Sequence, residues 1–185
     1  MAIHLRRCPA RLAFLLESPL RRPLLGLDRL IASLRLKDPA HVLDLGAGSG
    51  VVASEVIRAL RHGRVVLVDA QWKMMQRARR RMPARPGVHV AFTVAEAERL
   101  PFPPSCFDVV LLVTVLGELD DAAMTLQEVR RVLRSGGLVS ISEHLPDPDF
   151  RSARRVRSLL DAGGFVVRDH VGGRWSFTIN AVRRD

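Results

Sequence analysis

From residue 41 onward, short apolar runs alternate with segments whose apolar positions recur every three or four residues. Runs that are apolar on both faces are typical of buried parallel strands, and the three-to-four spacing predicts amphipathic helices. The predicted strands are His41–Leu45, Arg64–Asp69, Val88–Val94, Phe107–Val115 and Leu138–Glu143. The predicted helices are Val51–Leu60, Gln71–Met82, Asp121–Leu133 and Phe150–Ala162. This alternation predicts an α/β fold with a mostly parallel sheet and helices on both faces.

The two ends of the chain depart from this alternation. Residues 1–40 predict a helical lead-in, either a lid over the site or a helix packed on the sheet edge, and residues 41–185 predict the main domain. Near the other end, Gly172-Gly173 predicts a hairpin with a two-residue glycine turn. In its second arm, apolar positions alternate with polar ones: Trp175, Phe177, Ile179 and Ala181. Gly136-Gly137 is expected to end the helix that precedes the fifth strand.

Composition narrows the class of protein. The 185 residues suit one domain, and no apolar run approaches the length of a bilayer span. Without a recognisable secretory signal, a cytoplasmic location is expected. The net charge of +10 permits nucleic-acid binding, but 27 of the 29 basic residues are Arg, a skew that a genome-wide preference for Arg explains equally well and that leaves a solvated basic surface as the alternative. Scarce aromatics and no Tyr predict no stacking platform for single strands.

A glycine loop follows the first predicted strand, in the stretch Asp44-Leu45-Gly46-Ala47-Gly48-Ser49-Gly50. Glycines there allow a ligand to approach the backbone closely. The third glycine of a dinucleotide fingerprint would fall on Val51, and a phosphate loop would need Gly-Lys-Ser/Thr, so neither pattern fits. Asp69 ends the second strand, where a carboxylate binds ribose hydroxyls or, alternatively, caps the next helix.

These residues resemble a known family. Val42–Gly50 is similar to motif I of the class I S-adenosylmethionine-dependent methyltransferases, and Asp69 matches their ribose-binding acid. Further similar stretches are Ala95–Phe102, Phe107–Val110 and Glu128–Gly137. The resemblance covers about residues 41–182 and is nearest to the ubiquinone/menaquinone-biosynthesis-like (methyltransferase type 11) branch. It implies a Rossmann-like, doubly wound, seven-stranded sheet with a C-terminal antiparallel hairpin.

The resemblance also implies S-adenosylmethionine as the cofactor and assigns contacts to it. Asp44 would steer the ammonium, Asp69 would bind the ribose, and Glu96 would accept from the adenine amino group. Glu96 as a merely solvated acid, and Thr114 as a packing residue rather than a wall of the methionine end, remain alternatives. The other implied contacts are Gly46, Ala47, Gly48, Gly50, Ala70 and Ala97.

The implied reaction is methyl transfer to a small-molecule acceptor by in-line displacement at the sulfonium methyl. Such catalysis depends on proximity and orientation, and a general base is needed only for a protonated acceptor. His144 and Glu118, at the ends of the fifth and fourth strands, are the candidate bases, or else groups that cap loops. The histidine spacing predicts no metal site. An RNA-directed methyltransferase, and a non-catalytic cofactor-binding protein, are the alternatives; the oligomeric state stays open.

Overall fold

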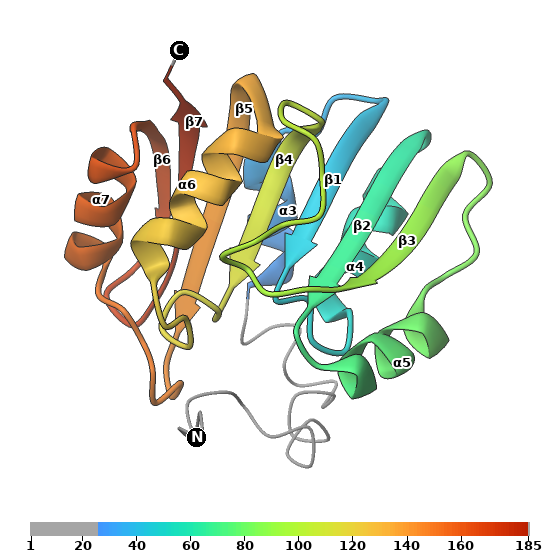
Figure 1. Cartoon of the computed structure of the whole chain (residues 1–185), viewed down its shortest axis with the longest axis horizontal. Helices are drawn as coiled ribbons and strands as arrows, with labels where there is room; N and C mark the ends of the chain where they lie inside the picture. Colours follow the sequence, from blue (N-terminus) through green and yellow to red (C-terminus); the bar gives the residue numbers. More distant parts are fainter. Residues whose placement is uncertain (1–25, 185) are drawn as a thin grey trace.

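The structure is a computed structural model, and it describes residues 26–184 (Figure 1). Its strands are β1 (Ala40–Leu45), β2 (Gly63–Asp69), β3 (Val88–Val94), β4 (Phe107–Val113), β5 (Leu133–His144), β6 (Phe165–Gly172) and β7 (Ser176–Arg183). Its helices are α3 (Leu27–Leu34), α4 (Val51–Ala59), α5 (Trp72–Arg81), α6 (Ala122–Val132) and α7 (Ala153–Ala162). Every strand and helix expected between residues 41 and 183 is therefore present.

All seven strands form one sheet, in the order β3-β2-β1-β4-β5-β7-β6. Strands β1 to β5 pair with one another in parallel. Strand β7 runs antiparallel to both of its neighbours, β5 and β6. The predicted fold, a doubly wound sheet closed by an antiparallel hairpin, is confirmed. The strand order reverses between β1 and β4, and ligands of such sheets bind at the carboxyl ends of the strands beside that point.

Each face of the sheet has its own apolar core, because successive side chains of a strand point to opposite faces. In β1, Val42 packs with α3, α4 and α5, while Leu43 packs with α6 and α7. Both side chains are fully buried. Burial of each such side chain contributes roughly 1.5–3 kcal/mol, so the central strands hold the edge on which the site lies in a fixed position.

Side-chain caps set where two helices begin. Asp121 accepts a hydrogen bond from the backbone N–H of Met124 (2.9 Å) at the start of α6. Ser152 does the same for Arg155 (3.4 Å), so α7 begins at Ala153 and not at Phe150 as predicted. A capping side chain satisfies an N–H that has no partner within the helix.

Two glycine predictions are wrong. Helix α6 ends at Val132, because Leu133 takes an extended conformation and pairs with Phe107, so Gly136-Gly137 lies inside β5. The register of the β4–β5 pair shifts between Phe107 and Val109, and the glycines lie in this irregular stretch.

The hairpin turn is also longer than predicted. Strand β6 ends at Gly172 and β7 begins at Ser176, so three residues, and not two glycines, connect the two strands. Trp175 belongs to this turn and is 57% exposed, whereas Phe177, Ile179 and Ala181 are buried as expected.

Helix α3 packs on the sheet face that also carries α4. Its apolar stripe, Leu27, Leu30 and Leu34, is buried in that core. The predicted first piece of the lead-in, with Leu12, lies outside the described residues. A lid role for residues 1–25 stays a prediction. No helix in residues 26–184 is long and apolar enough to cross a membrane.

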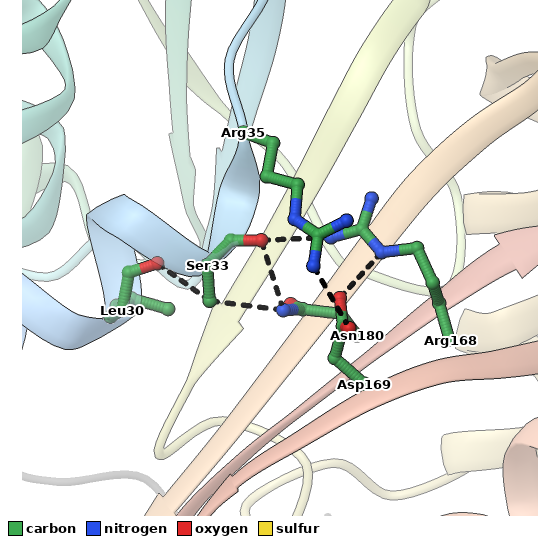
Figure 2. A network of polar contacts seen from close by, with 6 residues as sticks. All are labelled: Leu30, Ser33, Arg35, Arg168, Asp169 and Asn180. Carbon is green, nitrogen blue, oxygen red and sulfur yellow. Dashed lines mark hydrogen bonds and ion pairs between the residues drawn. The ribbon is translucent and has the colours of Figure 1, made fainter.

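Polar contacts fasten the end of α3 to the hairpin, as Figure 2 shows. The carbonyl of Ser33 accepts hydrogen bonds from Arg168 Nη2 (2.8 Å) and from Asn180 Nδ2 (3.3 Å). Asp169 lies between two guanidinium groups, those of Arg168 and Arg35. Because Asn180 is fully buried, its bonds to Ser33 fix the docking of α3 more firmly than the exposed ion pair does.

Candidate functional site

A cleft opens at the carboxyl ends of β1, β2 and β4, beside the reversal of strand order. Ten of the twelve residues predicted for the site line it: Asp44, Gly46, Ala47, Gly48, Asp69, Ala70, Glu96, Ala97, Thr114 and Glu118. These residues come from five separate stretches of the chain, and the parallel sheet brings them together. Gly50 and His144 do not line the cleft.

The glycine loop is held close to β2. The backbone N–H groups of Gly46 and Ala47 both donate to the carbonyl of Val68, at 2.8 and 2.9 Å. Gly46 has a φ of +70°, and a Cβ there would come within 2.4 Å of Val115 Cγ2. At Gly48, with a φ of +53°, a Cβ would meet nothing within 4 Å. The loop is thus tight behind Gly46 and open at Gly48, where it leaves room for a ligand.

Gly50 begins α4 and packs behind the glycine loop. It is the N-cap of α4 with a φ of +77°, and a Cβ there would lie 2.5 Å from Met82 Cε and 3.1 Å from Ala78 Cβ. A glycine at this position therefore lets α4 begin close to α5. Gly50 does not line the cleft, and its predicted contact with the cofactor stays a prediction.

The carboxylate of Asp69 joins the ends of β1 and β2. Its Oδ2 accepts from the N–H of Gly48 (2.9 Å), and its Oδ1 accepts from the N–H of Gln71 (2.8 Å). Gln71 is the N-cap of α5. The same side chain steadies the start of α5, as the capping interpretation expects, and it lines the cleft beside the glycine loop, where ribose binding stays a prediction.

Asp44 is a buried acid on the floor of the cleft, with a side chain that is 2% exposed. Its Oδ2 accepts from the N–H of Ala53 in the first turn of α4 (3.1 Å). Burial raises the pKa of Asp44 to about 7, against the effect of that hydrogen bond, and the negative charge of Asp69 raises it further. A positively charged ligand in the cleft would favour the ionised form.

A salt bridge on α6 positions the far side of the cleft, where Glu96 and Ala97 lie. Glu128 accepts from Arg131 Nε (2.7 Å) and from the N–H of Leu100 (2.8 Å). Arg131 also donates to the carbonyls of Leu100 (3.0 Å) and Phe102 (2.7 Å). The hydrogen bond from Arg131 lowers the pKa of Glu128. Sequence reasoning noted both stretches and missed their link, although the i,i+3 spacing of the pair was visible.

Strand β4 ends at Val113 and not at Val115, because Thr114 adopts a left-handed conformation with a φ of +55°. Its N–H donates to the carbonyl of Ser142 (2.8 Å), and its hydroxyl donates to the carbonyl of Val113 (2.7 Å). A positive φ is costly for a β-branched residue, and such strain is concentrated at functional sites. Thr114 lines the cleft, as predicted.

The loops after β4 and β5 are in close contact. A Cβ at Gly117 would lie 1.8 Å from the carbonyl oxygen of Asp149, so the two backbones touch only because residue 117 is glycine. Arg151 Nη2 donates to the carbonyl of Gly117 (3.4 Å). Glu118, the next residue, lines the cleft as predicted for a candidate base.

The end of β5 carries two buried titratable residues. His144 Nδ1 is hydrogen-bonded to Ser176 Oγ (2.8 Å), away from the cleft lining. Glu143 is 1% exposed, and its Oε2 accepts from the N–H of Arg151 (3.2 Å). Within residues 26–184, its Oε1 has no hydrogen-bond partner. Burial raises the pKa of Glu143 to about 7, and the charges of Asp147 and Glu118 add to this effect. Sequence reasoning favoured His144 because its ordinary pKa suits proton removal near neutrality, but neither His144 nor Glu143 lines the cleft.

No group of three or more His, Cys, Asp or Glu residues in the described part of the chain is arranged to hold a metal ion.

Comparison with known proteins agrees with this geometry. Residues 42–137 match the family described as "Methyltransferase domain". The chain is 33% identical to the ubiquinone/menaquinone biosynthesis C-methyltransferase of Coxiella burnetii (strain Dugway 5J108-111), over 78% of this chain and 57% of that protein. It is 36% identical to the demethylmenaquinone methyltransferase of Thermus thermophilus, over 60% of this chain and 50% of that protein. The chain therefore spans little more than half the length of these curated relatives.

Solved structures show the same fold. A SAM-dependent methyltransferase from Aquifex aeolicus superposes with a TM-score of 0.85 at 21% identity, covering 96% of this chain and 100% of that one. The YcgJ protein of Bacillus subtilis superposes with a TM-score of 0.71 at 19% identity, covering 86% and 98%. At this level of identity the likeness concerns the arrangement of strands and helices.

Proposed function

This chain belongs to the class I S-adenosylmethionine-dependent methyltransferases, and from that membership we propose that it transfers a methyl group to a small-molecule acceptor. The observation that carries the proposal is the cleft itself. It combines an open glycine backbone at Gly48, a carboxylate fixed by backbone amides at Asp69, and a buried acid at Asp44. These two carboxylates and the open backbone suit a nucleoside that bears hydroxyl groups and positive charge.

The acids and glycines that line the cleft match the charged and hydroxyl groups of S-adenosylmethionine. We propose that Asp69 receives the ribose hydroxyls, that Glu96 and Ala97 meet the adenine, and that Asp44 attracts the ammonium. Gly46, Ala47, Gly48 and Ala70 would form the surrounding backbone surface, and Thr114 would border the methionine end. The buried Asp44 supports the ammonium role, because a cation nearby offsets the cost of its ionisation.

When bound, S-adenosylmethionine supplies a methyl group that its sulfonium activates. The protein's part is to hold an acceptor in line, to exclude water, and to take up a proton where the acceptor carries one. Glu118 is the proposed proton acceptor at the cleft wall, because it lines the cleft and follows β4. His144 remains a candidate only if the acceptor site extends beyond the cleft toward the end of β5.

Two features support an acceptor with an apolar body. Val113, Val115 and Leu119 contribute apolar surface to the β4 side of the cleft. The curated relatives are named for methylation in ubiquinone and menaquinone biosynthesis, which concerns small molecules. We propose the same general class for this chain and leave the atom that is methylated unassigned.

Isothermal titration with S-adenosylmethionine tests cofactor binding. We expect one saturable site in the wild type and markedly weaker binding in Asp69→Asn, while Glu98→Gln, which removes a charge from the same cleft, serves as the matched control. Absence of saturation in the wild type would refute the proposal.

The acceptor class needs a separate measurement. Methyl-labelled S-adenosylmethionine would be incubated with the protein and an extract of the source cells, which is then divided by ultrafiltration. Label in the low-molecular-weight fraction supports a small-molecule acceptor, and label confined to the macromolecular fraction refutes it.

A further inference from the structure

The outer face of α5 carries a groove that is separate from the cleft. Its lining consists of Trp72, Met75, Gln76, Arg79, Arg80 and Phe92, none of which lines the cleft. Helix α5 and the edge strand β3 form its two sides. Trp72 is 62% exposed, so its ring is open to a ligand.

Aromatic and basic groups meet in this groove. The guanidinium of Arg79 lies over the ring of Phe92, with Cζ 5.9 Å from the ring centroid, within the range of a cation–π contact. Arg80 follows on the exposed surface of α5. Phe92 lies 20 residues from Trp72 in sequence. It is placed beside α5 because β3 pairs with β2. The fold thus brings an aromatic ring of β3 beside Trp72 and the basic groups of α5.

The charge of α5 is of one sign. Between Trp72 and Arg81 there are five basic residues and no acid: Lys73, Arg77, Arg79, Arg80 and Arg81. Arg81 is engaged inside the protein, where its Nε donates to the carbonyl of Ser49 (3.0 Å). Lys73, Arg79 and Arg80 are exposed, and of these Arg79 and Arg80 line the groove.

We propose that this groove binds single-stranded nucleic acid, with phosphates on Arg79 and Arg80 and a base on Trp72. Single strands are held by positive charge along the backbone and by aromatic side chains on which bases stack, and the groove offers both within one helix length. An anionic membrane fits less well. The exposed face of α5 carries one large apolar side chain among charges, whereas interfacial helices insert a broad apolar face.

Another basic helix, α7, lies at the other end of the sheet (Figure 1). It exposes Arg154, Arg155 and Arg157, none of which lines the cleft or the α5 groove. The turn residue Trp175 is exposed next to Arg174, which lies over its ring (4.6 Å), but it lines none of the described pockets. These two regions are therefore matched controls.

The test is fluorescence anisotropy of a labelled 12-nucleotide oligo(U) RNA, titrated with the full chain at several KCl concentrations and without methyl donor. We expect Trp72→Ala to weaken binding by roughly tenfold or more, since base stacking is a large part of single-strand affinity. Trp72→Phe keeps a ring and should retain most of the binding. Arg79→Gln/Arg80→Gln should reduce the salt slope by about 1.4, the value for two lost phosphate contacts.

The controls decide the interpretation. Arg154→Gln/Arg155→Gln and Trp175→Ala remove the same groups elsewhere and should change affinity less than twofold. Equal losses in the α5 and α7 variants would overturn the proposal in favour of net charge alone. So would preference for a 12-base-pair RNA duplex, the absence of binding at 100 mM KCl, or Trp72-dependent sedimentation with phosphatidylglycerol vesicles while RNA binding is unchanged.

The two proposals can fail independently. The groove does not overlap the cleft, and RNA binding is measured without S-adenosylmethionine. Because the replaced side chains are exposed, we expect circular dichroism and the thermal midpoint to be unchanged in all variants. The groove proposal concerns binding and assigns no methylated atom.

Discussion

The two walls of the cleft are built differently. On the β1–β2 wall, the acidic groups of Asp44 and Asp69 accept hydrogen bonds from backbone N–H groups of the loop and the helix starts. The β4–β5 wall combines Thr114, which lines the cleft at a positive φ, with residues behind the lining: Gly117 lies against Asp149, and Glu143 is buried with one oxygen lacking a hydrogen-bond partner within residues 26–184. The first wall is held by hydrogen bonds from backbone amides, while the second depends on contacts between particular side chains and loops.

The strongest disruption is expected at the β4–β5 wall. Gly117→Ala would place a Cβ 1.8 Å from the carbonyl oxygen of Asp149, so one of the two loops must move. We expect a loss of about 2–3 kcal/mol in the free energy of unfolding, as for overpacking elsewhere. The measurement is urea denaturation, with Gly173→Ala as the control, because a Cβ there meets nothing within 4 Å. Equal stability of the two variants would show that the loops are not in rigid contact.

The next largest effect is expected on the other wall. Each carboxylate oxygen of Asp69 accepts one hydrogen bond, from the N–H of Gly48 or of Gln71. In Asp69→Asn an NH₂ group replaces one oxygen, so one of these two N–H groups loses its acceptor. We expect the free energy of unfolding of the cofactor-free protein to fall by about 2 kcal/mol, within the range for hydrogen bonds to charged groups. Thermal unfolding without cofactor checks this, again beside Glu98→Gln. An unchanged midpoint would mean that the carboxylate meets only the ligand.

Asp44 and Glu143, the two acids with raised pKa values, make the stability of the protein depend on pH. Both are near 7 in the folded protein, so between about pH 4 and 7 the folded state keeps protons that the unfolded chain releases. The free energy of unfolding therefore falls as pH rises through this window. Asp44→Asn and Glu143→Gln should each reduce that slope.

Affinity for the positively charged cofactor should respond to only one of these acids. It should rise with pH up to about 7, by at most about tenfold per pH unit, because ionised Asp44 attracts the cation. Titrations at pH 6, 7 and 8 should show this dependence in the wild type and in Glu143→Gln, and its loss in Asp44→Asn. A dependence that survives in Asp44→Asn contradicts the assignment of the ammonium to this wall.

The smallest expected effect tests the strain at Thr114. Thr114→Gly relieves the positive φ but adds the conformational entropy of glycine to the unfolded chain, so we expect a net gain of about 0.5–1 kcal/mol. The thermal midpoint should rise by roughly 2 °C, and methyl transfer should slow. A lower midpoint would argue against strain, and an unchanged rate would argue against a functional role for it.

The same contrast explains what could be predicted from sequence. The loop through Gly46 and Gly48 and the acid Asp69 follow fixed spacings along single strands, so the first wall was predicted almost in full. Glu143 and Gly117 carry no motif, because their roles depend on contacts with residues 149–151 that only the fold creates. The hairpin was predicted from its glycines and its alternation, but the predicted two-residue turn was too short.

The most direct measurement is a crystal structure of the protein with S-adenosylhomocysteine, the product form of the cofactor. The cleft assignment predicts the nucleoside between Gly48 and Asp69, with its amino group toward Asp44 and its base beside Glu96. Ligand density at another place, or a cleft closed by protein side chains at saturating ligand, would contradict it.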